Sequence, residues 1–476
     1  MAAATIGSAS PKLAWIGKAP SVPYFMTETG DSWTPVGHND SITWPGLSGL
    51  LGMKDAASAD AYLAMLARNG INCIRLMLEH AETPEGHFEN PVGVFVPQMV
   101  ELWDRLFAMC QRHGIHVLLT PFDTFWSRIN WNDHPYNTRN GGPLDSPSRL
   151  LICGDTRKAI KQRLTFASER WGGTGTIFAW DLWNEIHPAQ AEENIEGFSS
   201  FIHDLSHELR ELETRLYGHA HLQTVSLFGP EIWRQPKLDL AEPIFRHPDL
   251  DFATIHIYPE GAVDDPTGTV APAVDMGKIV ADSILQIHDE RPILDTEHGP
   301  HRFKDRHISP PERFDDEHFR HMQWAHLAAG GAGGGMRWPN RHPHLLTPGM
   351  HGAQLALAKF LPLIEWTRFR RKSISEHIGL SNPAVRAVSC ADEQQALLWL
   401  VRTDSLGKSG ALKTRAAPLP VTVTVPGLMP GVYQLTAWDT REGQPLAAWL
   451  SHVQEGPLSF GLELATDLAV AVHRRN

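Results

Sequence analysis

The sequence predicts an α/β protein, a (β/α)8 TIM barrel with a small C-terminal antiparallel β-sandwich domain. Two observations lead to this prediction: short apolar runs alternate with amphipathic segments over most of the chain, and β-type runs separated by turn residues follow. The 476 residues leave room for both parts, because a barrel takes about 250 residues, or more with insertions. We therefore expect a barrel domain over residues 1–369 and a sandwich domain over residues 370–476.

The expected barrel strands are rich in Ile, Leu, Val and Phe, as is typical of parallel strands buried on both faces. They fall at residues 33–37, 71–78, 115–121, 177–183, 222–228, 252–258, 292–296 and 334–338. Apolar residues at helical spacing predict helices at 59–68, 97–112, 156–171, 195–217, 274–288, 315–329 and 352–361. Gly70 and Gly114 directly follow two of these helices, where a left-handed cap favours glycine. The connection after the fifth strand is weak, because residues 230–235 offer only a single turn.

The C-terminal part reads as antiparallel β-structure. Its β-type runs lie at residues 396–401, 421–425, 431–438 and 468–472, and the Pro-Gly pairs at 426–427 and 430–431 mark turns. Residues 421–425 alternate Val and Thr, the pattern of a strand with one face in water.

Composition excludes several classes of partner. The chain has 42 Lys and Arg against 54 Asp and Glu, a net charge of −12, which argues against binding nucleic acid or an anionic membrane surface. No apolar stretch approaches the roughly 18 residues of a membrane span. The 4 cysteines show neither a disulfide framework nor a metal-binding spacing. No signal peptide is evident, so we expect a cytoplasmic protein, or a secreted one if the N-terminus was trimmed. The oligomeric state stays open.

Two carboxylates stand at the ends of expected strands, where barrels of this kind carry their chemistry. Glu185 lies where the fourth strand meets its loop, and Glu297 lies at the same height on the seventh. Carboxylates are rarely buried without a partner, so each could also be an ordinary ion-pair residue. Together they are candidates for an acid and a nucleophile.

These strand ends resemble a known family. Trp-Asn-Glu at 183–185 and Asp-Thr-Glu at 295–297 are similar to the motifs of retaining β-glycoside hydrolases of clan A, most nearly glycoside hydrolase family 5. The resemblance implies that Glu185 is the acid/base and Glu297 the nucleophile. It also implies substrate-binding roles for further matching residues, which are Arg75, Asn184, His256, Tyr258 and Trp338. The third strand departs from the family's frequent Asp-x-His, because residues 120–126 read Thr-Pro-Phe-Asp-Thr-Phe-Trp.

The implied roles lead to expectations about charge. A nucleophile must be ionised, so we expect Arg75 and a hydrogen bond from Tyr258 to lower the pKa of Glu297. The acid/base needs a raised pKa while Glu297 is charged, and carboxyl groups about 5–5.5 Å apart mark a retaining enzyme. We expect Asn184 to hold the sugar 2-hydroxyl and His256 to orient Glu185 or the surroundings of Tyr258.

Further residues are candidates for substrate contact. Trp338 offers a flat floor for a sugar ring, or is an ordinary core residue. The segment 122–155 is long for a barrel loop; its Trp126 and Trp131 contact sugar or merely pack the loop. His38 and Asn39, placed after the first strand, are expected to bind hydroxyl groups.

The 26 histidines invite a metal site, but no HExxH or Cys/His spacing occurs, so we expect no metal and no cofactor. The function favoured is an exo-acting retaining glycosidase that cleaves β-mannosides or β-glucosides of small oligosaccharides. An endo-acting β-mannanase or β-glucanase, a transglycosylase, a non-catalytic sugar-binding barrel and a metal-dependent hydrolase stay open as alternatives.

Overall fold

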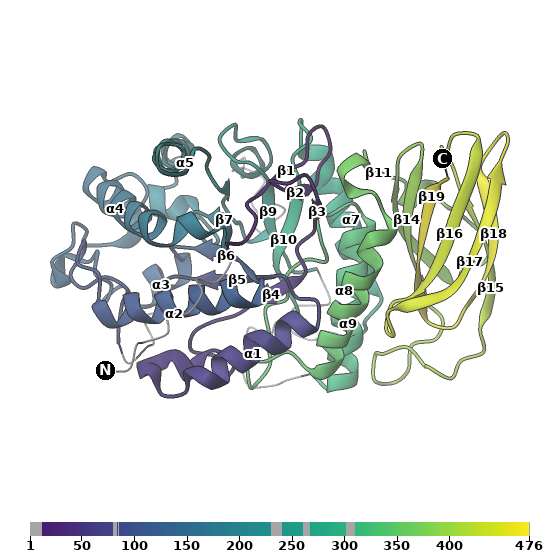
Figure 1. Ribbon diagram of the computed structural model, residues 1–476, viewed down its shortest axis with the longest axis horizontal. Helices are drawn as coiled ribbons and strands as arrows, with labels where there is room; N and C mark the ends of the chain where they lie inside the picture. The colour runs from purple at the N-terminus through teal and green to yellow at the C-terminus, as the bar shows by residue number, and fades with distance from the viewer. Residues whose placement is uncertain are drawn as a thin grey trace, which may run out of the picture.

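A parallel sheet forms the centre of the N-terminal part of the molecule (Figure 1). The computed structural model describes residues 12–79, 83, 85–229, 240–259, 267–300 and 310–475. Five strands pair in parallel in chain order: β4 (Gly37–Asn39), β5 (Cys73–Met77), β6 (His116–Thr120), β7 (Ile177–Asp181) and β8 (Leu222–Thr224). Two more, β9 (Ala253–Ile257) and β10 (Ile293–His298), form a second parallel pair. The prediction of a parallel α/β sheet is therefore confirmed.

Single parallel bridges join these two sheets at both of their edges. Phe228, which follows β8, is bridged to His256 in β9, and Arg337 is bridged both to His298 in β10 and to His38 in β4. The eighth strand expected at 334–338 is thus present only as bridges. Gly333 and Gly335 have φ angles of 126° and 74°, which lie outside the strand region and interrupt a regular ladder.

The first parallel strand begins later than the sequence predicts. Trp33 belongs to a small antiparallel sheet formed by β1 (Ile16–Lys18), β2 (Phe25–Thr27) and β3 (Ser32–Trp33). Pro35 then interrupts the run, because proline has no N–H to donate to a ladder. The parallel strand β4 starts only at Gly37, so His38 and Asn39 lie within a strand and not after it.

Helices alternate with the parallel strands, and all those expected from the sequence are present within a few residues. They are α1 (Ala56–Arg68), α2 (Pro97–His113), α4 (Gly154–Trp171), α5 (Ile195–Tyr217), α7 (Ala271–Gln286), α8 (Glu312–Ala328) and α9 (Pro348–Phe360). A short extra helix, α3 (Thr124–Ile129), lies in the long segment after β6. The side chain of Asp55 accepts a hydrogen bond from the Ser58 N–H and caps α1. Gly114 ends α2 at φ 72°. The turn expected at 230–235 lies outside the described residues.

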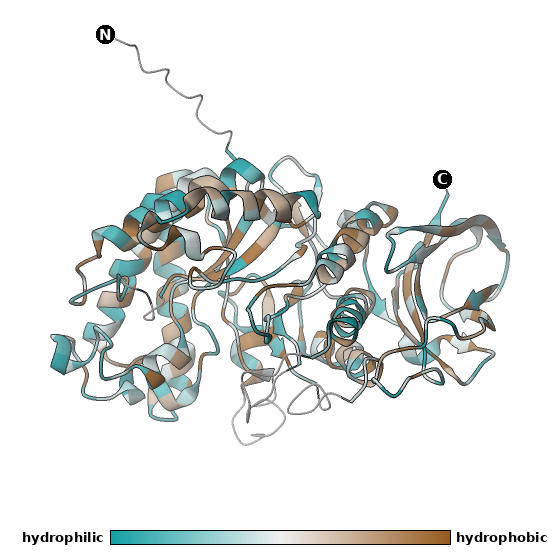
Figure 2. Ribbon diagram, turned by 90° about the horizontal axis from the view of Figure 1, so that it is seen from below, coloured by the Kyte–Doolittle hydropathy of each residue, from teal (hydrophilic) through white to brown (hydrophobic). Residues whose placement is uncertain are grey.

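Hydrophobic residues are concentrated inside this arrangement. In Figure 2 the inner strands are largely brown, whereas the helices around them carry both brown and teal residues. Every residue of β6, β7 and β9 is buried, which explains their almost continuous apolar sequences. Among the described residues, no helix is both long enough and apolar enough to cross a membrane.

Two antiparallel sheets make up the C-terminal part. The larger has the order β11-β13-β14-β19-β16-β17 and the smaller β12-β15-β18. Their bounds are β11 (Lys372–Ser373), β12 (Gly379–Leu380), β13 (Val385–Ala391), β14 (Gln395–Arg402), β15 (Leu419–Val425), β16 (Gly431–Asp439), β17 (Gln444–Val453), β18 (Leu458–Leu464) and β19 (Asp467–Arg474). In β15 the valines are buried whereas Thr422 is exposed, as the Val/Thr alternation indicates. The domain boundary at 369/370 stays a prediction.

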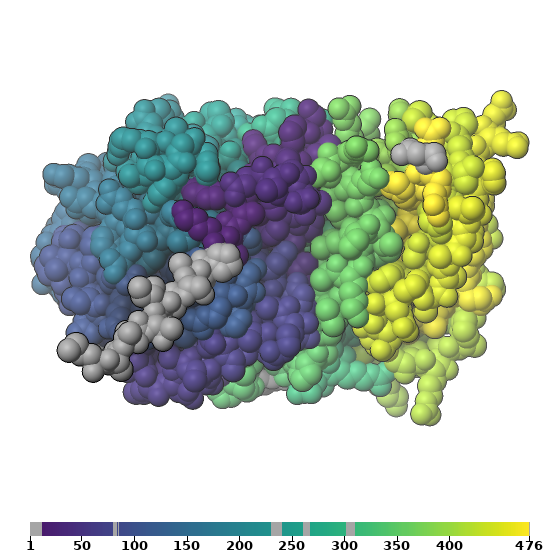
Figure 3. Space-filling model, viewed as in Figure 1, coloured from purple at the N-terminus to yellow at the C-terminus, as the bar shows by residue number. Residues whose placement is uncertain are grey.

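Strand β14 is buried on both faces and connects the two parts. Leu398 and Leu400 pack in the core between the two antiparallel sheets, whereas Leu397 and Trp399 join the hydrophobic cluster of the N-terminal part. Figure 1 shows α7, α8 and α9 between the parallel strands and this sheet, and in Figure 3 the green helical surface adjoins the yellow strands directly.

A buried ion pair crosses the same interface. Asp467 of β19 accepts a hydrogen bond from Arg320 of α8 at 3.0 Å and lies 3.4 Å from His321. Burial alone would raise the pKa of Asp467, but the charges of Arg320 and His321 hold it well below its usual range.

Replacing Asp467 tests this interface. Asp467→Ala should lower the free energy of unfolding by about 3–5 kcal/mol, because it leaves the buried Arg320 without its carboxylate. The folded pKa of Asp467 is depressed, so the difference from wild type should be full at neutral pH. It should shrink as pH falls below about 4, where the unfolded carboxyl is protonated. Chemical denaturation at several pH values measures both effects. Glu101→Ala, which breaks an exposed pair with Arg105, is the control and should change stability little. Equal losses of unfolding free energy in the two variants would contradict the stabilising role of the buried pair between Asp467 and Arg320.

Candidate active site

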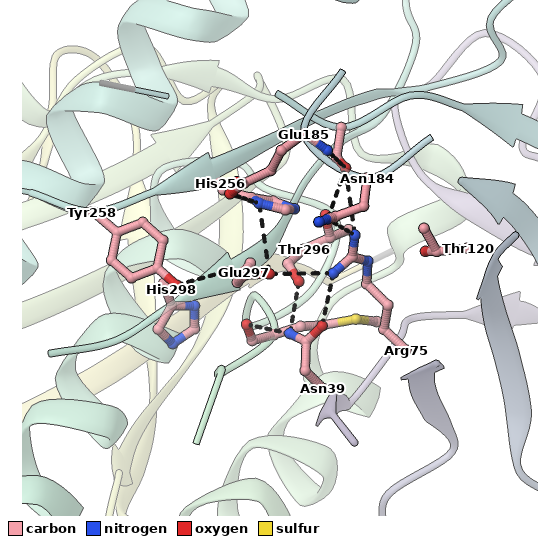
Figure 4. A network of polar contacts seen from close by, with 12 residues as sticks. Asn39, Arg75, Thr120, Asn184, Glu185, His256, Tyr258, Thr296, Glu297 and His298 are labelled. Carbon is pink, nitrogen blue, oxygen red and sulfur yellow. Dashed lines mark hydrogen bonds and ion pairs between the residues drawn. The ribbon is translucent and has the colours of Figure 1, made fainter. Parts of the chain in front are cut away.

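The expected site residues gather at the carboxyl ends of the parallel strands (Figure 4). Arg75 comes from β5, His256 from β9 and Glu297 from β10, whereas Asn184 and Glu185 follow β7 and Tyr258 follows β9. All six residues were expected from the sequence. None of them is more than 9% exposed. Such burial makes their charges and hydrogen bonds strongly interdependent.

Glu297 is held at both carboxylate oxygens. The hydroxyl of Tyr258 donates to Oε1 at 2.7 Å, and Nη1 of Arg75 donates to Oε2 at 3.3 Å. Both neighbours lie where the sequence analysis expected them. They fix the carboxylate plane from two sides, so that its orientation does not depend on a bound ligand.

The pKa of Glu297 corrects an expectation. Burial raises it to about 7, and the charge of Arg75 and the hydrogen bond from Tyr258 only partly offset this effect. The negative charges of Asp123 and Asp295 raise it further. The expected lowered pKa was therefore wrong, because the cost of burying a carboxylate outweighs a single nearby cation.

Arg75 ties together side chains from several strands. Its Nη2 donates to Asp181 Oδ2 at 2.8 Å and to the side-chain oxygen of Asn184, and its Nη1 also donates to Asn39 Oδ1 at 2.9 Å. Asp181, fully buried in β7, was not singled out from the sequence. The available signal was a lone acid inside an otherwise apolar strand, because such a residue needs a buried cation as its partner.

Glu185 occupies an unusual backbone position. Its φ is +46°, a left-handed conformation that non-glycine residues adopt at a cost of about 1–3 kcal/mol and mainly at functional sites. The backbone N–H of Glu185 donates a hydrogen bond to the hydroxyl of Ser226 at 3.1 Å. The side-chain Oε1 of Glu185 lies 2.6 Å from Nδ1 of His256. Burial and the charge of Arg75 keep the pKa of His256 well below its usual value, so this histidine is neutral.

The two glutamates face each other across a short gap. An oxygen of Glu185, a ring nitrogen of His256 and an oxygen of Glu297 all lie within 4.8 Å of one another. This triad is the one group in the described part of the chain with metal-ligand spacing. Each oxygen of Glu297 already accepts a hydrogen bond, one from a cationic guanidinium, and a bound cation would have to displace these donors.

His38 and Asn39 are engaged with the protein. His38 lies 3.3 Å from the Tyr62 hydroxyl and 3.3 Å from the Gln354 amide nitrogen, and burial lowers its pKa to about 3. The Asn39 amide donates to the Thr296 carbonyl at 2.8 Å while its oxygen accepts from Arg75. Asn39 thus supports Arg75, and sugar contact by either residue stays a prediction.

The three candidate tryptophans are all partly exposed. Trp338 packs edge-on against Trp44, with ring centres 4.9 Å apart. Trp131 donates from Nε1 to the Asp145 carbonyl at 2.9 Å and stacks on His134, so it packs the segment after β6. Trp126 lies in α3. Their contacts with sugar stay predictions.

The metal-like spacing of the triad can be tested directly. EDTA should leave the melting temperature of the purified protein unchanged, and added Zn²⁺ should not raise it, because Arg75 and Tyr258 already occupy Glu297. Thermal unfolding at increasing Zn²⁺ measures this. A resident or tightly bound ion would instead stabilise the folded chain by about 2.7 kcal/mol at a hundred times its dissociation constant, and such a shift would contradict the expectation.

Neither a family model nor a curated protein matches the chain. Solved structures do resemble it. A protein described as a glycoside hydrolase aligns with a TM-score of 0.62 at 13% identity, over 98% of this chain and 97% of its own. A glycoside hydrolase of family 5 from Bacteroides vulgatus ATCC 8482 aligns at 0.63 and 12% identity, over 97% and 92%. A family 5 mannosidase from Rhizomucor miehei aligns at 0.50 and 17% identity, over 71% and 92%. The chain therefore shares its fold with glycoside hydrolases of family 5, as the resemblance of its strand-end motifs implied.

Proposed function

We propose that the protein is a retaining β-glycosidase in which Glu297 is the nucleophile and Glu185 the acid/base. The observation that carries this proposal is the short gap between the two carboxylates, with one oxygen of each inside 4.8 Å. Retaining enzymes hold their carboxyl groups about 5–5.5 Å apart, whereas inverting enzymes need roughly 6.5–9.5 Å to admit a water molecule. The shared fold supports the same assignment.

We also propose that the parallel strands close into a (β/α)8 barrel. The bridges of Phe228 to His256, and of Arg337 to His298 and His38, support closure because they link the two parallel sheets at both edges. In such a barrel the carboxyl ends of β7 and β10 open on the same face, which is where Glu185 and Glu297 lie.

We propose a reaction in two steps. Ionised Glu297 attacks the anomeric carbon while Glu185 gives its proton to the glycosidic oxygen; the carbon–oxygen bond breaks and the leaving group departs as an alcohol. Glu185, now a carboxylate, then takes a proton from water as that water's oxygen displaces Glu297 from the anomeric carbon. As Glu297 is consumed in the first step, the negative charge that favours a proton on Glu185 disappears. Neutral His256 can exchange a hydrogen bond with Glu185 in either state, because imidazole both donates and accepts.

For the substrate we propose terminal β-mannosides, with β-glucosides next, released by exo action from small oligosaccharides. The similarity to a family 5 mannosidase supports mannose. The segment after β6, with α3 and the packed Trp131, is proposed to close one side of the substrate site. A panel of aryl β-mannoside, β-glucoside and β-galactoside beside polymeric mannan and glucan tests both points. Faster cleavage of the polymers would favour the endo-acting alternative.

The nucleophile assignment leads to a mutational test. Glu297→Ala should lower kcat/KM on the best aryl glycoside by about 10⁴-fold or more without changing the circular dichroism spectrum. Glu185→Ala should recover turnover when azide is added, because azide needs no general base, and NMR should show a glycosyl azide of β configuration. Glu101→Ala on the exposed face of α2 is the matched control. An α-configured azide, or activity in Glu297→Ala, would exclude this mechanism.

The hydrogen bond from Tyr258 gives the pH dependence a defined sign. It favours ionised Glu297, so Tyr258→Phe should raise the pKa of Glu297 above its value of about 7. Glu297 would then be ionised only at higher pH, and the acid limb of kcat/KM should move upward by about one pH unit. Tyr62→Phe is the control, since Tyr62 donates to Asp40 at 2.7 Å and not to Glu297. An acid limb that stays in place or moves downward would contradict the role of Tyr258.

A further inference from the structure

We propose that Asp123 is a positioning residue for this reaction, which holds Asn184 so that the second amide N–H of Asn184 meets the sugar 2-hydroxyl. The inference rests on the proposed glycosidase function. It concerns the segment that follows β6, where the sequence departs from the frequent Asp-x-His motif.

The backbone at Asp123 pairs with the backbone at Asn184. The two residues form an isolated parallel bridge, in which the Asn184 N–H donates to the Phe122 carbonyl at 2.8 Å and the Thr124 N–H donates to the Asn184 carbonyl at 3.2 Å. Asp123 is 5% exposed and Asn184 is 2% exposed. The relative position of the two side chains is therefore set by the sheet itself.

Both carboxylate oxygens of Asp123 are used. Oδ2 accepts the Trp126 N–H at 2.8 Å and caps α3, while Oδ1 accepts a hydrogen bond from Nδ2 of Asn184. The cap prevents the carboxylate from rotating, so it stays directed at Asn184.

The amide of Asn184 is thereby held in one orientation. Its oxygen accepts from Arg75, which can only donate, and its nitrogen donates to the Asp123 carboxylate, which when ionised can only accept. An inverted amide would face both partners with the wrong atom. One N–H is taken by Asp123, and the other is left to donate to a ligand. A bond from this N–H to the 2-hydroxyl would strengthen in the transition state.

Asp123 also acts on Glu297 through its charge. Burial raises the pKa of Asp123 to about 6 against the hydrogen bonds from Asn184 and the Trp126 N–H, so it is ionised at neutral pH. Its charge raises the pKa of Glu297. Among the described residues, Glu297 is also faced by titratable or charged groups of Arg75, Glu185, His256, Tyr258 and Asp295.

Asp123→Ser separates positioning from helix capping. Serine is a good N-cap and keeps the bond to the Trp126 N–H, but it is too short to reach Asn184. The variant is compared with wild type on an aryl β-mannoside or β-glucoside and on the aryl 2-deoxy-β-glycoside that is common to both sugars. We expect kcat/KM to fall about 10- to 100-fold on the full sugar and only a few-fold on the 2-deoxy sugar. Equal losses on both would overturn the inference.

A double-mutant cycle with Asn184→Ala adds an independent readout. Once Asn184 is gone, Asp123→Ser should cost little further activity on the full sugar. Additive losses would show that Asp123 does not act through Asn184. Asp55→Ser, the same substitution at the cap of α1, is the control and should leave kcat/KM unchanged.

The pH profile gives the third readout. Removing the charge of Asp123 should lower the pKa of Glu297, so the acid limb of kcat/KM should move to lower pH, opposite to Tyr258→Phe. An acid limb that rises or stays in place counts against Asp123. If wild type cleaves none of the glycosides, the proposed function fails and the inference fails with it. Cleavage by wild type with equal losses in the variant overturns the inference alone.

Discussion

One buried guanidinium holds the site together. Arg75 binds Asp181 from β7, Asn39 from β4, Glu297 from β10 and the Asn184 that follows β7. It is 1% exposed, and its pKa is raised because the nearby carboxylates outweigh the cost of burial. Arg75 cannot lose its proton under ordinary conditions, so the carboxyl groups around it must share the protons. Burial raises the pKa of Glu297, Asp123, Asp181 and Asp295. The site thus holds one permanent cation among several acids whose pKa values burial raises.

The scaffold behind Glu297 is also polar and buried. The Arg337 carbonyl accepts the Asn39 N–H at 2.9 Å, and the Arg337 guanidinium is held by Asp315 of α8 at 2.6 Å. The same helix carries Arg320, which pairs with Asp467 of β19. A continuous set of contacts therefore runs from the antiparallel sheets through α8 to the strand that supports Arg75. The C-terminal part is therefore connected to the site through α8.

The sequence predicted much of this site because the ends of buried strands can be recognised in it. An apolar run that stops at Asn-Glu or Asp-Thr-Glu places an acid at a known height, and Glu185 and Glu297 do meet in the structure. Asp181 was missed because its partner, Arg75, is distant in the chain. The pKa of Glu297 was expected to be lowered but is raised, because the depth of burial cannot be read from the local sequence. The hydrogen bond that the amide of Asn184 donates to Asp123 depends on a strand register that sequence patterns do not supply.

The errors in the predicted fold also have local causes in the sequence. Pro35 delayed the first parallel strand, and left-handed glycines broke the eighth into single bridges. Strand β17 was overlooked because it lies at the edge of its sheet and is mostly exposed, so its residues lack the alternation that reveals a half-buried strand. By contrast, the valines of β15 face the core and its threonines do not, and that strand was found.

In the proposed mechanism, Glu297 forms a covalent bond with the sugar. An aryl 2-deoxy-2-fluoro-β-glycoside tests it most directly, because the fluorine slows release of the intermediate enough for mass spectrometry of the digested protein. We expect one added sugar mass on the peptide that contains Glu297, and none in Glu297→Ala. A label on Glu185 or on any other residue would contradict it, as would first-formed product of inverted configuration with no label at all.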